Sequence, residues 1–192
     1  MKDGKSVIIV GVGGQGTLLA SRLLGNVMLS QGYDVKMSEV HGMSQRGGSV
    51  VTYVRYGETV YSPVIQDGEA DVILAFEQLE AARYLSCLKR GGILLLNTQQ
   101  IDPMPVVIGA AKYPQGLVQA MQEKGARLLA LDALKLAKEA GSAKAVNVVL
   151  LGVLARQLDL DKQVWLDAIR ATVKPQFIEM NEKAFALGYQ AG

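Results

Sequence analysis

The stretch from Ser6 to Gly16 reads SVIIVGVGGQG and decides how the chain folds. Its first part, Ser6–Val10, is a short apolar run rich in β-branched residues, which is typical of a strand buried on both faces of a parallel sheet. Its second part, Gly11–Gly16, suits a tight turn from that strand into a helix, whose apolar side chains then recur at helical spacing. Asp34–Val40 resumes as a strand. The pattern therefore predicts a βαβ unit with a right-handed crossover.

The next segment, Ser49–Ser62, has the pattern of two consecutive strands without a helix between them. Two strand-like runs, Ser49–Arg55 and Thr59–Ser62, flank the turn-forming residues Tyr56-Gly57-Glu58. Such a pair of runs around a short turn indicates a β-hairpin, and hence an antiparallel strand pair within Ser49–Ser62.

Alternating strands and helices follow, and the chain ends in helices. The predicted strands of this part are Ala70–Phe76, Gly92–Asn97 and Ala126–Asp132, with Val106–Ile108 as a possible short strand. The predicted helices between Ser62 and Ala133 are Gln78–Leu88 and Leu117–Lys124. From Ala133 onward the periodicity is helical throughout, including the strongly apolar segment Ala145–Gln157. The sequence thus predicts one α/β domain spanning residues 1–192. Its fold should be Rossmann-like and three-layered, with a mostly parallel sheet, an antiparallel hairpin and a helical C-terminal region.

The composition excludes several classes of protein. No apolar stretch approaches the ~20 residues that cross a bilayer, so no membrane span is expected. The 20 basic and 18 acidic residues are scattered and aromatic residues make up 6%, which gives nucleic-acid binding no support. One cysteine and one histidine cannot form a disulfide or an iron–sulfur cluster within the chain, and they argue against a zinc site. We therefore expect no bound metal and a reducing, cytoplasmic setting.

The first glycine-rich loop is a candidate phosphate site. Gly11, Gly13 and Gly16 match G-x-G-x-x-G between a strand and a helix, where backbone N–H groups and the positive end of the helix dipole favour an anion. A dinucleotide site would also need an acidic residue ending the second strand, and Glu39 nearly fits this position. Alternatively, the glycines only allow a tight turn and close packing of helix on sheet. The candidate cofactor-binding residues are Gly11, Gly13, Gly14, Gln15 and Gly16.

A second glycine-rich loop follows the second strand. It carries the only histidine of the chain together with a hydroxyl, an amide and a guanidinium, and arginine suits carboxylate or phosphate groups. Since both loops follow parallel strands, they should lie side by side at the ligand-binding edge of the sheet. The loop is predicted to contact a partner subunit or the substrate, and no residue in it can be assigned a catalytic role. Its candidate residues are His41, Ser44, Gln45, Arg46, Gly47 and Gly48.

Several motifs together carry a resemblance to a known family. GVGGQGT at residues 11–17, SEVHGMSQRGGSV at 38–50, YSP at 61–63 and ADVILAFE at 70–77 occur with NT at 97–98, AVN at 145–147 and KPQF at 174–177. From about Ser6 to Gly188 the chain resembles the γ-subunit or γ-domain family of 2-oxoacid:ferredoxin oxidoreductases. The segment His41–Gly48 is similar to that of the indolepyruvate branch.

The resemblance implies a reaction that this chain serves without holding its cofactors. A 2-oxoacid, coenzyme A and oxidised ferredoxin would give an acyl-CoA, carbon dioxide and reduced ferredoxin. Thiamine diphosphate and [4Fe-4S] clusters are implied on a larger α subunit, which agrees with the single cysteine here. The implied partners are that α subunit and ferredoxin as electron acceptor, and the implied substrates are indolepyruvate and other aryl pyruvates.

Three alternatives remain open at this point. The chain could be the γ subunit of a related oxidoreductase acting on pyruvate, 2-oxoisovalerate or 2-oxoglutarate. It could be an assembly subunit whose loops never reach the active site. It could also be a free-standing dinucleotide-binding protein.

Overall fold

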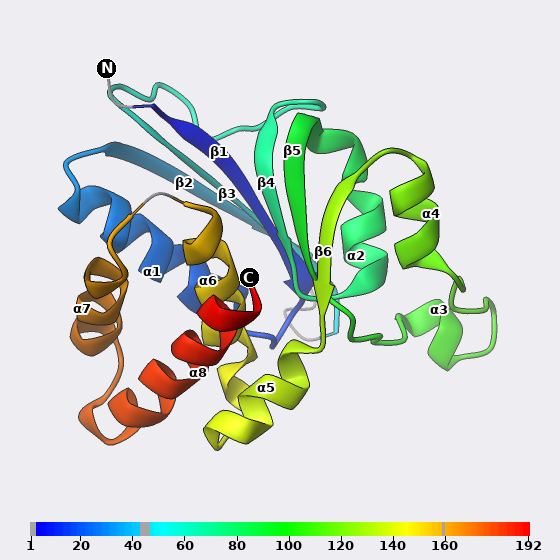
Figure 1. Ribbon diagram of the computed structural model, residues 1–192. Helices are drawn as coiled ribbons and strands as arrows, with labels where there is room; N and C mark the ends of the chain where they lie inside the picture. The colour runs from blue at the N-terminus through cyan, green and yellow to red at the C-terminus, as the bar shows by residue number, and fades with distance from the viewer. Residues whose placement is uncertain (1–2, 43–46, 159) are drawn as a thin grey trace.

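The computed structural model describes residues 3–42, 47–158 and 160–192. Within these residues, six strands form one sheet in the order β2-β3-β1-β4-β5-β6 (Figure 1). Strand β3 is antiparallel to both β1 and β2, whereas β1, β4, β5 and β6 run parallel to one another. The strands are β1 (Lys5–Val12), β2 (Asp34–His41), β3 (Ser49–Gly57), β4 (Ala70–Ala75), β5 (Leu88–Asn97) and β6 (Arg127–Leu131).

The predicted hairpin within Ser49–Ser62 is wrong. β3 is antiparallel as expected, but it pairs with β1 and β2, so the hairpin is formed by β2 and β3. The predicted second strand, Thr59–Ser62, is absent because side chains bond to backbone groups in this region that a strand would use for pairing. The Val60 amide donates to the Asp34 carboxylate over 2.9 Å, and Arg55 donates to the Val64 carbonyl over 2.8 Å. Pro63 also lacks the N–H that a strand needs.

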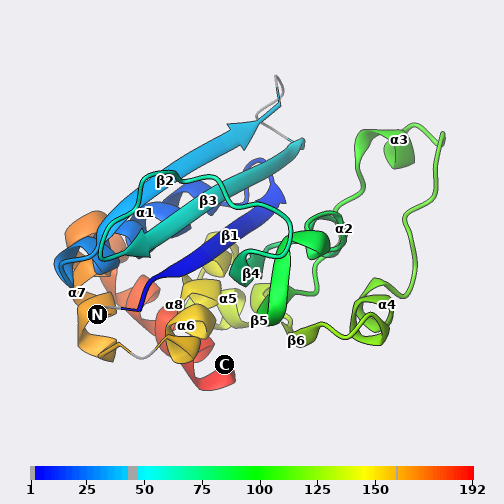
Figure 2. The same cartoon turned by 90° about the horizontal axis from the view of Figure 1, so that it is seen from above.

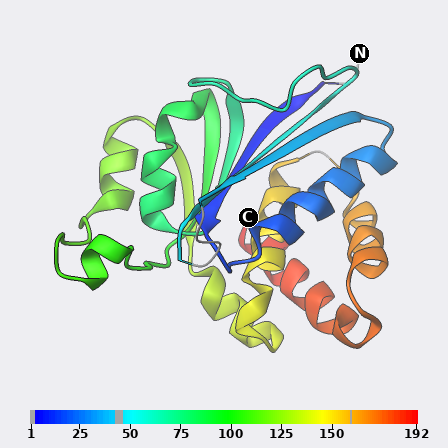
Figure 3. The ribbon, with the colours of Figure 1, turned by 180° about the vertical axis from the view of Figure 1, so that it is seen from behind.

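Helices cover both faces of the sheet, which confirms the three-layer α/β fold (Figures 1 and 3). One face carries α1 and the C-terminal helices α5 to α8, and the other carries α2 and α4. The helices are α1 (Thr17–Ser30), α2 (Gln78–Arg83), α3 (Met104–Val107), α4 (Leu117–Glu123), α5 (Ala133–Ala140), α6 (Val146–Gln157), α7 (Lys162–Thr172) and α8 (Ile178–Ala191), with 3-10 turns η1 (Leu85–Cys87), η2 (Ala143–Ala145) and η3 (Pro175–Phe177).

The parallel strands supply side chains to both hydrophobic layers. Ile9 and Leu74 pack toward α1 and α6, whereas Ile8 and Ile73 pack toward α2 and α4. This two-sided burial explains why these strands read as continuous apolar runs in the sequence.

Helix α6 is the centre of the C-terminal layer, as its apolar sequence predicted. All residues from Val146 to Ala155 are buried. It packs against α8 so closely that a Cβ at Gly188 would lie 1.9 Å from the Val149 carbonyl oxygen, and one at Gly152 would lie 2.2 Å from the Phe185 carbonyl oxygen. Glycine at these two positions therefore sets the separation of the helices.

One further expectation is wrong. Val106–Ile108 is not a strand, because Val106 and Val107 lie in the short helix α3. The amides of Val106 and Val107 both donate to the Pro103 carbonyl, and no strand lies alongside to pair with this segment among the described residues.

Candidate functional site

The first glycine-rich loop runs from the end of β1 into α1. Gly14 and Gly16 adopt positive φ angles of 105° and 84°, which glycine tolerates and other residues rarely adopt. A Cβ at Gly16 would lie 2.8 Å from the Asn147 side-chain nitrogen, so the backbone and α6 are in close contact there. Space around Gly14 is open, since a Cβ added at this position would meet no atom within 4 Å. The loop thus has a packed end at Gly16 and an open end at Gly14.

The two glycine-rich loops lie side by side, as predicted from the strand directions. The Gly13 amide donates to the Gly48 carbonyl over 2.8 Å, and the Gly47 amide donates to the Gly13 carbonyl over 3.3 Å. His41, at the end of β2, is exposed, and its Nδ1 lies 3.1 Å from the Gly42 carbonyl. Ser44, Gln45 and Arg46 lie outside the described residues.

Gln15 ties the first loop to the centre of the sheet. Its Oε1 accepts from the Val12 amide over 2.7 Å, and its Nε2 donates to the Phe76 carbonyl over 3.1 Å. The same Nε2 lies 3.4 Å from Gln99 Oε1. The side chain therefore fixes the turn geometry, which leaves the backbone N–H groups of Gly14 and Gly16 as the part of the loop able to meet a ligand.

Asn97 completes this polar network at the end of β5. It is fully buried, and its Nδ2 donates to the Phe76 carbonyl over 3.0 Å while its Oδ1 accepts from the Ala133 amide over 3.1 Å. The network thus links the ends of β1, β4 and β5 through the side chains of Gln15 and Asn97, which both donate to the Phe76 carbonyl. Phe76 and Asn97 lie within motifs that carry the family resemblance, but the sequence did not predict that these residues join a network with Gln15, because they lie far from it along the chain.

Two buried carboxylates beside the loops were also missed. Glu77 caps α2 by accepting from the Glu80 amide over 3.0 Å, and Glu80 accepts a short hydrogen bond from the Ser49 hydroxyl, just after the second loop. Burial raises the pKa of Glu80; Glu77 adds to this effect, while Ser49 and Arg83 oppose it. The signal was present in the sequence, since acidic residues directly after a buried strand are typical helix N-terminal residues.

A cavity of about 490 Å³ opens beside the first loop. It lies between the N-terminus of α1 and the segment that joins α5 to α6. No side chain caps α1 at Gly16, and the amides of Gly14 and Gly16 make no hydrogen bond within the described part of the chain. Lys144 adds a positive charge at its wall. The lining residues are Gly14, Gln15, Gly16, Gln99, Leu134, Ala143, Lys144 and Val146.

This cavity has the chemistry of an anion site. Free backbone amides at a helix N-terminus and one lysine attract negative charge, and its lining supplies neither an acidic side chain nor a cysteine or serine nucleophile. Among the described residues, no group of three or more His, Cys, Asp or Glu could hold a metal ion. The geometry suits binding of a phosphate or carboxylate.

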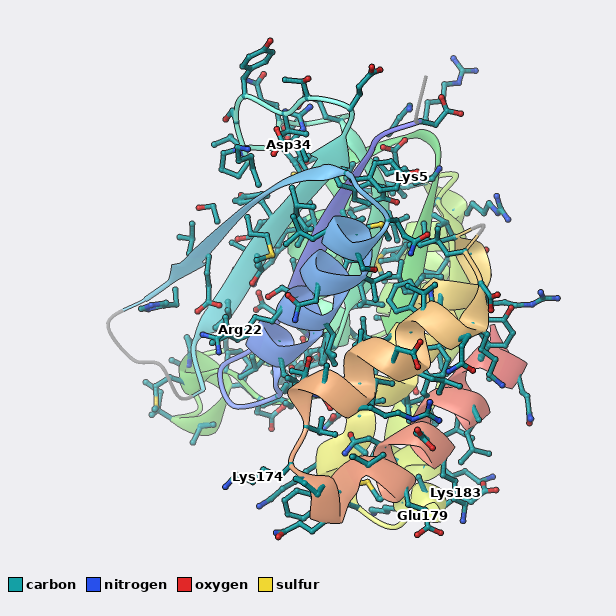
Figure 4. All side chains as sticks on the ribbon, turned by 90° about the vertical axis from the view of Figure 1, so that its left-hand side faces the viewer. Lys5, Arg22, Asp34, Lys174, Glu179 and Lys183 are labelled. Atoms are coloured by element: carbon teal, nitrogen blue, oxygen red, sulfur yellow. The ribbon has the colours of Figure 1, made fainter. Side chains whose placement is uncertain are left out.

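The strand order disfavours a dinucleotide site. In dinucleotide-binding folds the first two strands are parallel neighbours, so that the acid after the second strand reaches the ribose. Here β3 lies between β1 and β2, and Glu39 is exposed on the outermost strand. Figure 4 shows this outer region from the side, with Asp34 at the start of β2 and Arg22 on α1.

Comparison with known proteins decides the family. Residues 6–191 match the pyruvate ferredoxin/flavodoxin oxidoreductase family. The chain belongs to this family. It is 46% identical to indolepyruvate oxidoreductase subunit IorB of Thermococcus kodakarensis, over 97% of this chain and 95% of that subunit. The resemblance stated from the sequence motifs is thereby confirmed.

Solved structures of family members share the fold. The γ subunit of keto/oxoacid ferredoxin oxidoreductase from Geobacter sulfurreducens aligns with a TM-score of 0.73 at 25% identity, over 97% of each chain. In 2-oxoglutarate:ferredoxin oxidoreductase from Magnetococcus marinus the same fold aligns with a TM-score of 0.75 at 18% identity. That alignment covers all of this chain and 31% of the longer one. This fold thus occurs both as a separate subunit and as part of a longer chain.

The described helices include none with the length and apolar character needed to cross a membrane.

Proposed function

We propose that this chain is the small, γ-type subunit of an indolepyruvate:ferredoxin oxidoreductase and that it acts only in complex with a larger α subunit. The observation that carries this proposal is the 46% identity to subunit IorB along nearly the whole of both chains. The complex would convert indolepyruvate and other aryl pyruvates, with coenzyme A, to acyl-CoA and carbon dioxide while reducing ferredoxin. We place the complex in the cytoplasm.

The redox cofactors do not fit this chain. [4Fe-4S] clusters take cysteine thiolates, and the sequence has one cysteine, Cys87, which is buried beside Asp67. No thiamine-binding motif is visible in the sequence. We therefore assign thiamine diphosphate and the clusters to the larger subunit and derive no catalytic step through them here.

The role of this chain would be to bind and position. The cavity beside Gly14 and Gly16 combines backbone amides, the positive end of α1 and Lys144, which together favour a phosphate group such as those of coenzyme A. Gly47 and Gly48 hydrogen-bond to Gly13 of this loop, and the second loop, His41–Gly48, would contact the substrate or the larger subunit. Both loops would then face the larger subunit at one edge of the sheet.

Co-expression with the large subunit and a panel of oxoacids tests the proposal. The purified complex should reduce ferredoxin with indolepyruvate and phenylpyruvate at a kcat/KM at least about tenfold above that with pyruvate, 2-oxoisovalerate or 2-oxoglutarate, which corresponds to about 1.4 kcal/mol of transition-state discrimination. A preference for one of the three aliphatic acids would instead indicate a related oxidoreductase. Failure of the two chains to co-purify would contradict the subunit role.

A further inference from the structure

The segment Ile101–Tyr113, here called the arm, projects from the body of the protein. It connects β5 to the loop before α4 and contains the short helix α3. Figures 1 and 2 show α3 reaching outward beyond α2 and α4, at the edge of the sheet where the parallel strands end. No residue of α3 is buried.

The end of the arm is apolar and exposed. Met104, Val107 and Ile108 are 67%, 65% and 68% exposed, so three large apolar side chains lie open within one short stretch of the chain. Only Asp102 and Lys112 carry charge in the arm. A protein rarely exposes such a cluster unless another surface covers it.

The arm is nevertheless ordered by hydrogen bonds of its own. The Ile108 amide donates to the Met104 carbonyl over 3.0 Å, and the Ala111 amide donates to the Pro105 carbonyl over 2.9 Å. Pro103 and Pro105 further restrict the backbone. This conformation is held without a hydrophobic core beneath it.

Glu77 fixes both ends of the arm. Its side chain is 1% exposed, and its Oε1 accepts from the Ile101 amide over 3.1 Å and from the Tyr113 hydroxyl. The Tyr113 oxygen in turn accepts from the Leu79 amide over 3.2 Å. One buried carboxylate therefore anchors the start and the end of the arm to the N-terminus of α2, and the apolar residues between them are held outward.

The arm adjoins the candidate site. Gln99, two residues before the arm, contacts Gln15 of the first glycine-rich loop. Whatever covers the glycine-rich loops at this edge would thus also be within reach of the arm.

We propose that the arm is a docking element for the larger subunit of the oxidoreductase, with Met104, Val107 and Ile108 inserted into an apolar recess of that subunit. This inference rests on the proposed function. Two observations favour the larger subunit over a second copy of this chain. In the Magnetococcus marinus oxidoreductase the same fold is part of a longer chain, and the arm shares its edge with the loops assigned to the active complex. Because Glu77 and two prolines already hold the arm in place, less ordering is needed on binding.

The test compares arm variants with matched controls in binding to the purified large subunit. Val107→Ser and Ile108→Ser remove exposed arm residues, whereas Tyr61→Ser and Leu29→Ser remove exposed apolar residues elsewhere, at 94% and 55% exposure. Because none of the four side chains is buried, all variants should melt within a few degrees of the wild type. Each arm variant should weaken the Kd at least about tenfold, as for a buried interface anchor, and each control should stay within about twofold.

A second variant separates the anchoring from the apolar contact. Tyr113→Phe keeps the ring and removes the hydroxyl whose hydrogen bond Glu77 accepts. In the isolated chain it should speed hydrogen exchange of the amides at 106–111 and also weaken the Kd, although the exposed apolar residues are unchanged. Unchanged exchange and unchanged Kd would overturn the anchoring role of Glu77.

The outcomes distinguish this inference from the proposed function. If the wild-type chain binds the large subunit and both arm variants bind equally well, the arm proposal is wrong and the subunit role stands. If the arm variants lose only self-association, a second copy covers the arm and the proposal is likewise wrong. If the wild-type chain does not bind the large subunit, the proposed function fails and the arm proposal falls with it.

Discussion

The backbone amide of Gly13 donates to the carbonyl of Gly48 over 2.8 Å and joins the two glycine-rich loops. Gly13 follows β1, and Gly48 lies just before β3, at the tip of the hairpin that β3 forms with β2. A displacement of the backbone at one loop, for example by a bulky side chain, would therefore also displace the other loop. The two motifs act as one structural unit at the proposed ligand edge.

Substitution of Gly14 tests whether this unit binds a ligand. Gly14→Leu adds a side chain at a positive φ, into open space beside the cavity that Gly14 and Lys144 line. We expect a folded chain, a stability loss of about 1–3 kcal/mol from backbone strain, and a clear fall in oxoacid-dependent ferredoxin reduction by the complex. Gly125→Leu is the control, because it has a similar φ of 83° and equally open space at the opposite edge of the sheet. Equal activity of both variants at saturating coenzyme A would show that the first loop is only a turn.

Gln15 should matter for stability. Gln15→Leu leaves the Val12 amide and the Phe76 carbonyl without this partner, so we expect the free energy of unfolding to fall by about 1–3 kcal/mol. Gln119→Leu provides the comparison, because Gln119 is exposed and its side chain donates to Glu123, and it should change stability by less than about 0.5 kcal/mol. Urea unfolding of the two variants measures the difference. Similar values for both would mean that Gln15 does not hold the loop.

The contact of α6 with α8 makes a sharper stability prediction. A Cβ at Gly188 meets the backbone of Val149, which cannot move aside without separating the helices, so Gly188→Ala should cost about 3 kcal/mol. At Gly25 of α1 the nearest atom is instead the flexible end of Met37, and Gly25→Ala should be within about 1 kcal/mol of the wild type. A smaller loss for Gly188→Ala than for Gly25→Ala would contradict the helix packing described here.

Glu80 should make stability depend on pH in a defined direction. Burial raises its pKa in the folded state above the ordinary value of 4.5, so the folded chain holds this proton more tightly than the unfolded chain. The protonated Glu80 side chain therefore favours folding at pH values below about 4.5. This contribution to stability is lost as the pH rises from about 4.5 through the raised pKa of the folded state. Glu80→Gln keeps an acceptor for Ser49 without the charge, so its stability relative to the wild type should increase over the same interval. Glu123→Gln, at an exposed position of α4, is the control for loss of a charge. A fall in the stability of Glu80→Gln relative to the wild type across this pH interval, measured by chemical unfolding, would refute the assignment.

Much of the sheet and the C-terminal helices was predictable from local patterns. β1, the first glycine-rich loop and α1 follow from an apolar run, a glycine motif and helical spacing within residues 5–30. The placement of both loops at one edge followed from the parallel direction of β1 and β2. The burial of α6 followed from its apolar sequence, and the one polar side chain among its buried residues, Asn147, has its Nδ2 3.4 Å from the Gly16 carbonyl.

The features that the sequence did not reveal depend on distant partners. β3 could pair with either a following strand or β1 and β2, and its residue pattern does not distinguish these neighbours. The α3 turn depends on Pro103 and on the absence of a neighbouring strand among the described residues. The partners Gln15 and Phe76 are 61 residues apart, and Glu77 and Tyr113 are 36 apart. No local periodicity marks such pairs, so the polar network and the anchored arm became visible only in the folded chain.

Titration of this chain into a fixed amount of purified large subunit is the most direct test of the central claim. The rate of indolepyruvate- and coenzyme A-dependent ferredoxin reduction should rise from near zero to a plateau as the chain is added, and the chain alone should show no activity. A rate independent of the added chain, or full activity of this chain by itself, would contradict its role as an obligate subunit.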